Sequence, residues 1–276
     1  MTVITFFEAL AAALSAAILI MLPIELWSRR RSLNIAALKE MAASAGVLLP
    51  ALATSGLVLA FVSALMTTAD ALTPWRIPTT WWSALLCLLL VDFLFYWDHR
   101  IAHRVRSIWA VSHSVHHSSH QFDQTTGLRV SFADGFISPW FYLPAVLTGF
   151  DPLLVAASFG VMVGYQQWLH TETIGRLGWF DRVFNSPANH RVHHGSQDHY
   201  LDKNYGGILI VWDRLFGTWE PEGEQPVYGL TTPIGSSHLW TVHTAEIGTL
   251  WRDLKAAGSW RDRLRLLLAP PGTVAP

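Results

Sequence analysis

The 276-residue sequence contains little charge and almost no cysteine. Charged residues make up 14% and hydrophobic residues 51%, whereas a soluble domain is about 25% charged. This composition indicates a membrane protein. A formal net charge of -1 excludes the broad basic surface of a nucleic-acid-binding protein. The single cysteine, Cys87, excludes an internal disulfide and a cysteine-rich zinc or iron–sulfur site, and its apolar neighbours indicate a packing role.

Long apolar runs, by contrast, are abundant in the sequence. A membrane-spanning helix needs about 20 mostly apolar residues, and five runs approach that length, at 3–27, 41–66, 81–97, 132–150 and 152–170. Pro139 and Pro144 predict a kink in the fourth run, and the sequence Gly-Phe-Asp-Pro at 149–152 predicts a turn before the fifth. We expect an all-α integral membrane protein with about five transmembrane helices.

The basic residues predict the orientation of these helices. With the N-terminus outside, Arg76 is the one basic residue on the outer side, which leaves 18 of the 19 Lys and Arg inside, as the positive-inside rule requires. Residues after 170 then form a cytoplasmic cap, and a bacterial inner membrane is the expected location. The tail 242–268 pairs Trp251 and Trp260 with basic residues, which favours interfacial amphipathic helices; a solvated helix packed on the cap is the alternative.

Histidines are concentrated on the predicted inner side. The sequence reads HRIAH at 99–103, HSVHH at 113–117 and HRVHH at 190–194, with a separate His170. Histidines three or four positions apart share one helical face and can aim their rings at one point. Nine imidazoles exceed the four to six ligands of one first-row ion, so we predict a cytoplasmic cap that binds two metals. A pH-sensing surface or an adventitious metal-binding patch is the alternative.

The nine predicted ligands are His99, His103, His113, His116, His117, His170, His190, His193 and His194. Histidine ligands need an acceptor for their second ring nitrogen, and the candidates are Asp98, Glu172, Asp181, Asp202, Asn204 and Gln166. Asp92 is a further candidate, because an acid inside a span tends to face a functional cavity; a structural hydrogen bond is the alternative. We expect His120 to support a ligand, and His199, His238 and His243 to be cap or surface residues.

These motifs, from about residue 81 to 235, resemble the fatty acid hydroxylase and sterol desaturase superfamily of membrane non-haem di-iron oxygenases. QWLHTE at 167–172 and YGLTTPI at 228–234 are similar to the alkylglycerol monooxygenase-like bacterial members. The resemblance implies two irons on the nine histidines, with Asp92, Glu172, Asp202 and Asn204 as catalytic or supporting residues. It also implies a membrane lipid substrate, O₂ and a separate electron donor, for which a tetrahydropterin is the candidate.

The expected function is therefore hydroxylation or desaturation of a lipid C–H bond with O₂. Two other classes compete with it. A zinc-dependent membrane lipid hydrolase would need three protein ligands and a water, and a metal transporter would place ionisable residues along a path near mid-membrane. We divide the chain into transmembrane helices at 1–80, a fatty acid hydroxylase-like catalytic region at 81–240 and interfacial helices at 241–276.

Overall fold

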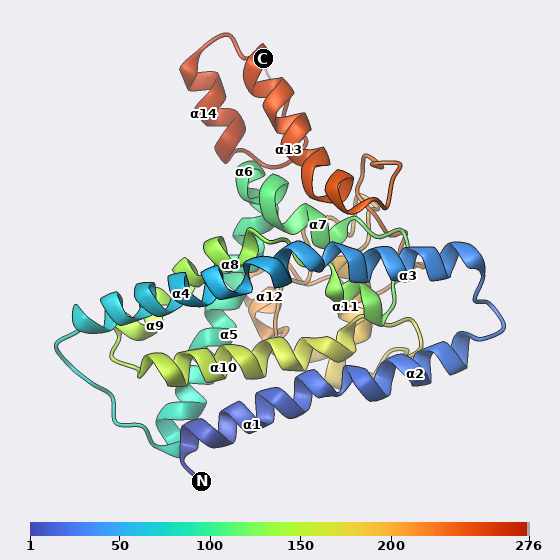
Figure 1. Ribbon diagram of the computed structural model, residues 1–276. Helices are drawn as coiled ribbons and strands as arrows, with labels where there is room; N and C mark the ends of the chain where they lie inside the picture. The colour runs from blue at the N-terminus through green and yellow to red at the C-terminus, as the bar shows by residue number, and fades with distance from the viewer. Residues whose placement is uncertain (275–276) are drawn as a thin grey trace.

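The computed structural model describes residues 1–274 and is all-helical over that range, with two isolated bridges but no strand. Figure 1 shows the long helices as a bundle below a two-helix projection. The longer helices are α1 (Val3–Ala16), α2 (Ile18–Arg29), α3 (Ile35–Val47), α4 (Leu49–Ala71), α5 (Trp81–Arg104), α10 (Pro152–Gln166), α13 (Leu239–Ala256) and α14 (Trp260–Leu268).

Short helices carry much of the remaining chain. The α-helical ones are α6 (Arg106–Ile108), α7 (Ser114–His117), α8 (Asp134–Ile137), α9 (Leu143–Leu147), α11 (Pro187–His193) and α12 (Val211–Phe216). A π-helix, η1 (Trp109–His113), precedes α7. The 3₁₀ helices are η2 (Gln124–Leu128), η3 (Ser138–Tyr142), η4 (Gln167–Leu169) and η5 (Phe180–Arg182).

Three helical segments are long and apolar enough to cross a membrane. They are Val3–Arg29, which combines α1 and α2, Ile35–Ala71, which combines α3 and α4, and Trp81–Arg104, which is α5. The three segments coincide with the first three apolar runs of the sequence. Most of the first two segments is exposed in the isolated chain, as expected for helices that face lipid.

The expected count of five spans is not confirmed, because neither of the last two runs forms a continuous helix of span length. Residues 132–150 break into α8, η3 and α9. Pro139 and Pro144 each stand at the start of a new short helix, where the missing N–H and the fixed φ of proline interrupt the preceding hydrogen-bond ladder. The fifth run is α-helical for only 15 residues, or about 22 Å, before it tightens into the three-residue 3₁₀ helix η4.

The predicted turn at 149–152 is confirmed. Gly149 has φ +99°, a conformation that favours glycine, and its carbonyl accepts a 2.8 Å hydrogen bond from the Ile77 N–H. The Asp151 side chain caps α10 by accepting from the Leu153 N–H at 2.8 Å. This turn therefore fixes where α10 begins and returns the chain toward α1 and α5.

The apolar core lies where α1, α5 and α10 pack together, and buried side chains from α5 and α10 form most of it. Gly164 allows α10 to approach α1 closely, since a Cβ at this position would lie 2.8 Å from the Leu14 Cβ. Close approach of helix backbones through small residues is typical of helix pairs in membranes. The packing holds α5, and with it the histidines near its C-terminal end, in a fixed place.

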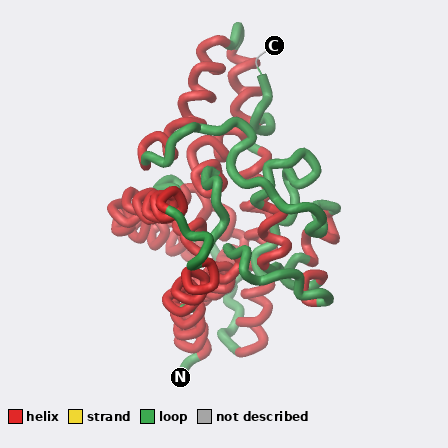
Figure 2. Tube along the Cα trace, turned by 90° about the vertical axis from the view of Figure 1, so that its right-hand side faces the viewer, coloured by secondary structure: helices red, strands yellow, loops and turns green. Residues whose placement is uncertain are grey.

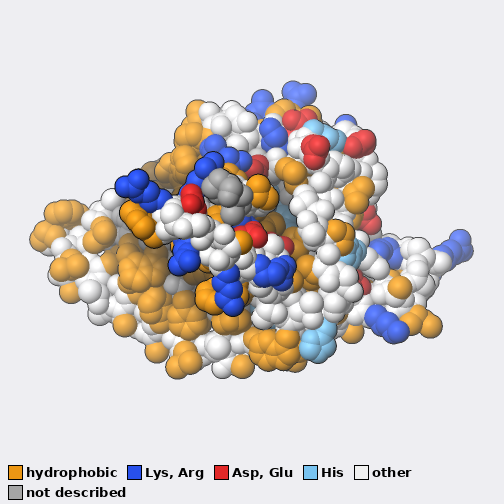
Figure 3. All heavy atoms as spheres, turned by 90° about the horizontal axis from the view of Figure 1, so that it is seen from above, with side chains coloured by type: hydrophobic (Ala, Val, Ile, Leu, Met, Phe, Trp, Pro, Cys, Tyr) orange, Lys and Arg blue, Asp and Glu red, His pale blue; other side chains and the backbone are white. Residues whose placement is uncertain are grey.

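The polar cap is built from loops and short helices. Figure 2 shows these loops gathered on one side of the long helices. The α13–α14 hairpin projects from the body (Figure 1) and is joined to it through Arg106, whose N–H donates to the Ala269 carbonyl at 2.9 Å and whose side chain pairs with Asp253. Trp251 and Trp260 are exposed on it, and Figure 3 shows basic side chains among apolar ones on this face.

Replacing Gly149 with alanine should destabilise the protein. An alanine at φ +99° is strained, and its Cβ would lie 2.8 Å from Trp75 Cδ1. We expect a loss of about 1–3 kcal/mol, measured as a lower thermal unfolding midpoint in detergent micelles. Gly178→Ala is the control, because Gly178 also has positive φ but a Cβ there meets nothing within 4 Å. Equal destabilisation by both variants would show that the contact with Trp75 does not matter.

Candidate metal centre

Nine histidines from four separate segments meet in two groups. The first group holds five rings, whose candidate ligand nitrogens lie within 4.8 Å of one another: His99, His103, His113, His117 and His193. The second group holds four rings in the same way: His116, His170, His190 and His194. The groups adjoin, since the His117 and His194 rings stack with centroids 4.3 Å apart. These are the nine residues that the sequence singled out.

The allocation of rings differs from the expectation that each HxxHH motif aims at one point. His113 and His117 enter the five-histidine group, whereas His116 enters the four-histidine group. In the second motif His190 and His194 enter the four-histidine group and His193 enters the other. Consecutive residues on a helix point about 100° apart, so adjacent histidines diverge toward different groups while the i, i+4 pair stays together.

Local helix geometry positions these rings. His99 and His103 occupy the last two turns of α5, and His113 ends the π-helix η1. A π-helical turn inside a helix changes the direction of the residues that follow and is frequent at functional sites. The Ser186 side chain caps α11 through the Asn189 N–H, which fixes the start of the helix that carries the second HxxHH motif.

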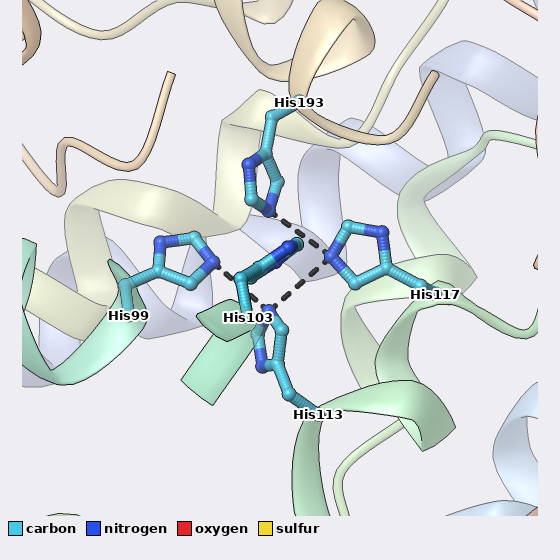
Figure 4. A group of neighbouring side chains, drawn as sticks. All are labelled: His99, His103, His113, His117 and His193. Carbon is cyan, nitrogen blue, oxygen red and sulfur yellow. Dashed lines mark hydrogen bonds between the residues drawn. The ribbon is translucent and has the colours of Figure 1, made fainter. Parts of the chain in front are cut away.

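The spacing of the ring nitrogens suits a metal ion. In the five-histidine group the Nε2 atoms of His99 and His113 are 2.9 Å apart, those of His113 and His117 3.2 Å, and those of His117 and His193 3.1 Å (Figure 4). Two nitrogens held about 2.1 Å from one ion at a right angle lie about 3.0 Å apart. The observed distances therefore match neighbouring ligands of a single ion.

The four-histidine group has the same spacing. The Nε2 of His170 lies 3.2 Å from that of His116 and 2.9 Å from that of His190, and the Nε2 atoms of His194 and His116 are 3.1 Å apart. The two groups therefore present five and four nitrogens at similar spacing, which fits two ions.

Backbone carbonyls fix the tautomers of several rings. Nδ1 of His99 lies 2.8 Å from the Tyr205 carbonyl, Nδ1 of His193 2.9 Å from the Lys203 carbonyl, and Nδ1 of His116 3.3 Å from the Arg129 carbonyl. A carbonyl only accepts, so the proton must be on Nδ1 and each Nε2 carries a lone pair directed into its group. Converging lone pairs without protons between them are a donor set for a cation.

Burial keeps the rings of the cap neutral. It lowers the pKa of His116 to about 4, and it lowers the pKa of His113, His117, His190 and His194 well below the usual value for histidine. Desolvation penalises the imidazolium form. The neutral form is the one that binds metals, so the rings are prepared as ligands at neutral pH.

Asp202 lies beside the five-histidine group. Its Oδ1 lies 3.7 Å from Nδ1 of His103, and its Oδ2 accepts from Arg104 at 2.5 Å. Although partial burial raises the pKa of Asp202, the His103 ring and Arg104 lower it to about 2. An ionised carboxylate hydrogen-bonded to the outer nitrogen of a ligand histidine orients the ring and increases its basicity. Asp202 lies where the sequence predicted such an acid, but its 3.7 Å separation from His103 exceeds a hydrogen bond, so the supporting role stays a prediction.

Asp92 is placed away from the rings. Its carboxylate accepts from the Ile208 N–H at 2.6 Å, the Leu209 N–H at 3.2 Å and the Trp212 indole N–H at 2.9 Å. It therefore anchors the chain at 208–212 to α5, which favours the structural alternative over the catalytic role that we expected.

The other polar candidates support the fold around the site. Asn204 joins the Asn189 and Glu220 backbones, Glu172 accepts from Gln225 and Tyr228, and Asp98 accepts from Ser138 and Tyr142. Asp181 accepts from the Leu177 N–H. The Gln166 side chain turns to Met162 rather than to His170.

The remaining histidines lie outside both groups. His120 is exposed and packs on Gly229, so it does not support a ligand ring as expected. His199 and His238 are exposed, whereas His243 is buried with its Nε2 3.1 Å from the Val47 carbonyl. His243 is thus an interior residue of the cap and not a surface one.

Sequence reasoning missed the residues that surround the four-histidine group. Phe122 contacts the His194 ring with centroids 5.0 Å apart and stacks on Tyr228. Two acids of the first two helical segments, the buried Glu25 and the half-buried Glu40, also reach this region. A signal existed for Glu25, since an acid inside an apolar run is costly and commonly functional; the contacts of Phe122 had no such signal.

The sequence is similar to a known protein family and to several known proteins. Residues 84–218 match the model of the fatty acid hydroxylase family, a range that contains all nine histidines. Residues 84–218 therefore belong to the fatty acid hydroxylase family. Alkylglycerol monooxygenase of Xenopus tropicalis is 41% identical over 199 residues, which is 72% of this chain and 44% of that protein.

Two more distant relatives act on other lipids according to their names. Ornithine lipid hydroxylase OlsE of Rhizobium tropici is 30% identical over 169 residues, covering 59% of this chain and 50% of that protein. A probable Delta(7)-sterol 5(6)-desaturase of Neurospora crassa is 29% identical over 148 residues, covering 50% and 39% respectively. This chain spans less than half the length of the alkylglycerol monooxygenases that it matches. No solved structure matches it.

Removing one ring from either group should reduce metal binding. We expect His117→Ala and His194→Ala to lower the metal content of the purified protein by about one ion, because each ring supplies a nitrogen to a different group. His238→Ala is the control, since His238 is exposed and lies outside both groups. The measurement is metal analysis by mass spectrometry; unchanged content in His194→Ala would contradict the assignment.

Replacing Asp92 with asparagine should affect stability and leave metal content intact. The amide removes one of the two carboxylate oxygens that accept three buried hydrogen bonds, and an unpaired buried donor costs about 1–3 kcal/mol. The measurements are the thermal unfolding midpoint and metals per protein. A variant of wild-type stability that has lost its metal would place Asp92 in the centre after all.

Proposed function

We propose that this protein is a membrane-bound di-iron oxygenase that hydroxylates, or desaturates, a lipid at a C–H bond with O₂. The observation that carries this proposal is the convergence of nine neutral imidazoles in two adjoining groups. Membership of the fatty acid hydroxylase family supports the reaction class. The names of the relatives, a monooxygenase, a lipid hydroxylase and a sterol desaturase, support a lipid substrate.

Iron fits the ligand set better than a hydrolytic zinc. A catalytic zinc site uses three protein ligands and one open position, whereas the groups here offer five and four imidazoles. Imidazole ligands suit iron as well as zinc, so zinc is the ion to exclude in purified protein. When bound, two irons would supply the redox chemistry that activates O₂ toward an unreactive C–H bond.

The position of α5 supports access from the bilayer. This helix is apolar enough to span a membrane over Trp81–Arg104, and His99 and His103 stand in its last two turns. A lipid chain that lies beside α5 therefore needs to travel only along the helix to reach the metal centre. The buried rings and the aromatic side chains of Phe122 and Tyr228 next to them limit the entry of water, which protects a reactive oxidant.

The cap supports cytoplasmic delivery of electrons. The excess of Lys and Arg on the loops that adjoin the cap favours a cytoplasmic location under the positive-inside rule, with the N-terminus outside. A soluble reductant would then reach the cap without crossing the membrane. A tetrahydropterin is our candidate reductant, because alkylglycerol monooxygenase is among the relatives.

The decisive experiment is lipid profiling with and without O₂. Membranes that contain the wild-type protein, with Fe²⁺ and tetrahydropterin, should accumulate a lipid species heavier by one oxygen atom, or lighter by two hydrogens, and ¹⁸O₂ should label the hydroxylated product. We expect the His194→Ala variant to lose at least about 100-fold in rate, because an incomplete ligand set cannot hold the ion. Product formation without O₂, or turnover supported by zinc alone, would favour the hydrolase.

A further inference from the structure

A buried acid and a half-buried one lie on helices that precede the family match. Glu25 of α2 is 3% exposed, and the Glu40 side chain of α3 is 13% exposed. Both residues belong to the first two candidate membrane spans, outside residues 84–218. An acid in such a helix is expensive and needs partners, so the partners of these two carboxylates show what they do.

Both carboxylates hold one short segment, residues 123–129, which we call the strap. Oε2 of Glu25 accepts from the Gln124 N–H at 2.8 Å, at the start of η2. Oε1 of Glu40 accepts from Arg129 at 2.5 Å, at the end of the strap. Arg129 is 1% exposed and also donates to Ser44 of α3 at 3.0 Å. The strap is therefore fastened at each end to a different helix.

The strap in turn contacts two rings of the four-histidine group. The Arg129 carbonyl accepts from Nδ1 of His116. A Cβ on Gly127 would lie 3.1 Å from Nδ1 of His170, so the strap backbone runs directly against that ring. The strap thus sets the orientation of one ring through a hydrogen bond and limits another by contact.

Glu25 reaches the same group by a second route. Its Oε1 accepts from the Thr171 hydroxyl at 2.6 Å, and Thr171 follows His170 in the chain. The Thr171 carbonyl accepts from Arg191 at 2.9 Å, and Arg191 follows His190. One carboxylate on α2 therefore fixes the backbone beside two of the four rings.

The five-histidine group has supports of its own that involve neither acid. His99 and His193 donate to the carbonyls of Tyr205 and Lys203, and Asp202 lies beside His103. In the four-histidine group, by contrast, Nδ1 of both His170 and His190 is buried and lacks a hydrogen-bond partner among the described residues. Those two rings are oriented by packing and backbone position, which makes them sensitive to the strap.

We infer that Glu25 and Glu40 are positioning residues for the second metal ion, acting through the strap on the four-histidine group. This inference rests on the proposed di-metal function and deepens it. The N-terminal helices are then part of the metal centre in addition to anchoring the protein. Loss of an outer support weakens metal binding about 10–100-fold, and here the loss should fall on one ion of two.

The test is an anaerobic Fe²⁺ titration of metal-stripped, full-length protein in lipid nanodiscs, with bound iron counted per protein. Wild type should bind two ions. Glu25→Leu suits an apolar helix, removes the acceptor of the Gln124 N–H and releases the Thr171 hydroxyl from α2. It should keep one ion at wild-type affinity and bind the other about 10–100-fold more weakly. Glu40→Gln should act in the same direction. Glu8→Gln, at an exposed acid of the same span, should bind both ions normally.

A double-variant cycle locates the affected ion. Adding Glu25→Leu to His190→Ala should change nothing further, because the same site is already damaged, whereas adding it to His193→Ala should weaken both sites. Gly127→Ala tests the strap alone, because its Cβ presses on His170 without touching either acid. Glu25→Gln, which keeps one acceptor oxygen, decides the role of the acid if Glu25→Leu fails to fold. Normal binding of two ions in the folded strap and acid variants, or equal weakening of both, would overturn the inference. Two bound irons without an O₂-dependent product would instead overturn the proposed oxygenase and leave this inference standing.

Discussion

The metal centre depends on which nitrogen of each imidazole carries the proton. At His99, His116 and His193 a backbone carbonyl accepts from Nδ1. The Nε2 atom of each of these rings therefore carries the lone pair, and it faces the other rings. Buried imidazoles whose lone pairs converge in this way disfavour protonation and repel one another. A cation between the rings would accept these lone pairs, so the geometry fits the proposed metal site.

The sequence predicted the nine rings because their signal is local. Histidines three or four positions apart can be recognised directly in the amino-acid sequence, and the number of histidines implied two ions. What the spacing did not reveal is that each HxxHH motif divides its rings, which follows from the 100° rotation between neighbours such as His116 and His117. That rotation was available from helix geometry alone, so the error lay in treating three rings as one face.

Other features depend on tertiary contacts and could not be read in this way. The acceptors at Tyr205 and Lys203 are backbone carbonyls, which every residue has. The identity of the side chains therefore could not predict that these two positions would accept from His99 and His193. Asp92 was predicted to be functional because it is an acid in an apolar run. In the structure its carboxylate accepts a hydrogen bond from the Ile208 N–H, 116 residues later in the sequence. The fourth and fifth runs had the composition of spans, but Pro139 and Pro144 broke one, and the other was helical over too few residues. The ligand roles of the nine rings remain a prediction until metal is measured.

The strap places part of the machinery outside the region by which the family is defined. Residues 84–218 supply every imidazole, but Glu25 and Glu40 come from helices whose sequences only need to be apolar to serve as anchors. Exchanging these two helices would therefore leave the nine histidines in place and remove the carboxylates that hold the strap. For protein engineers, the unit to transplant is the histidine region together with its two leading helices.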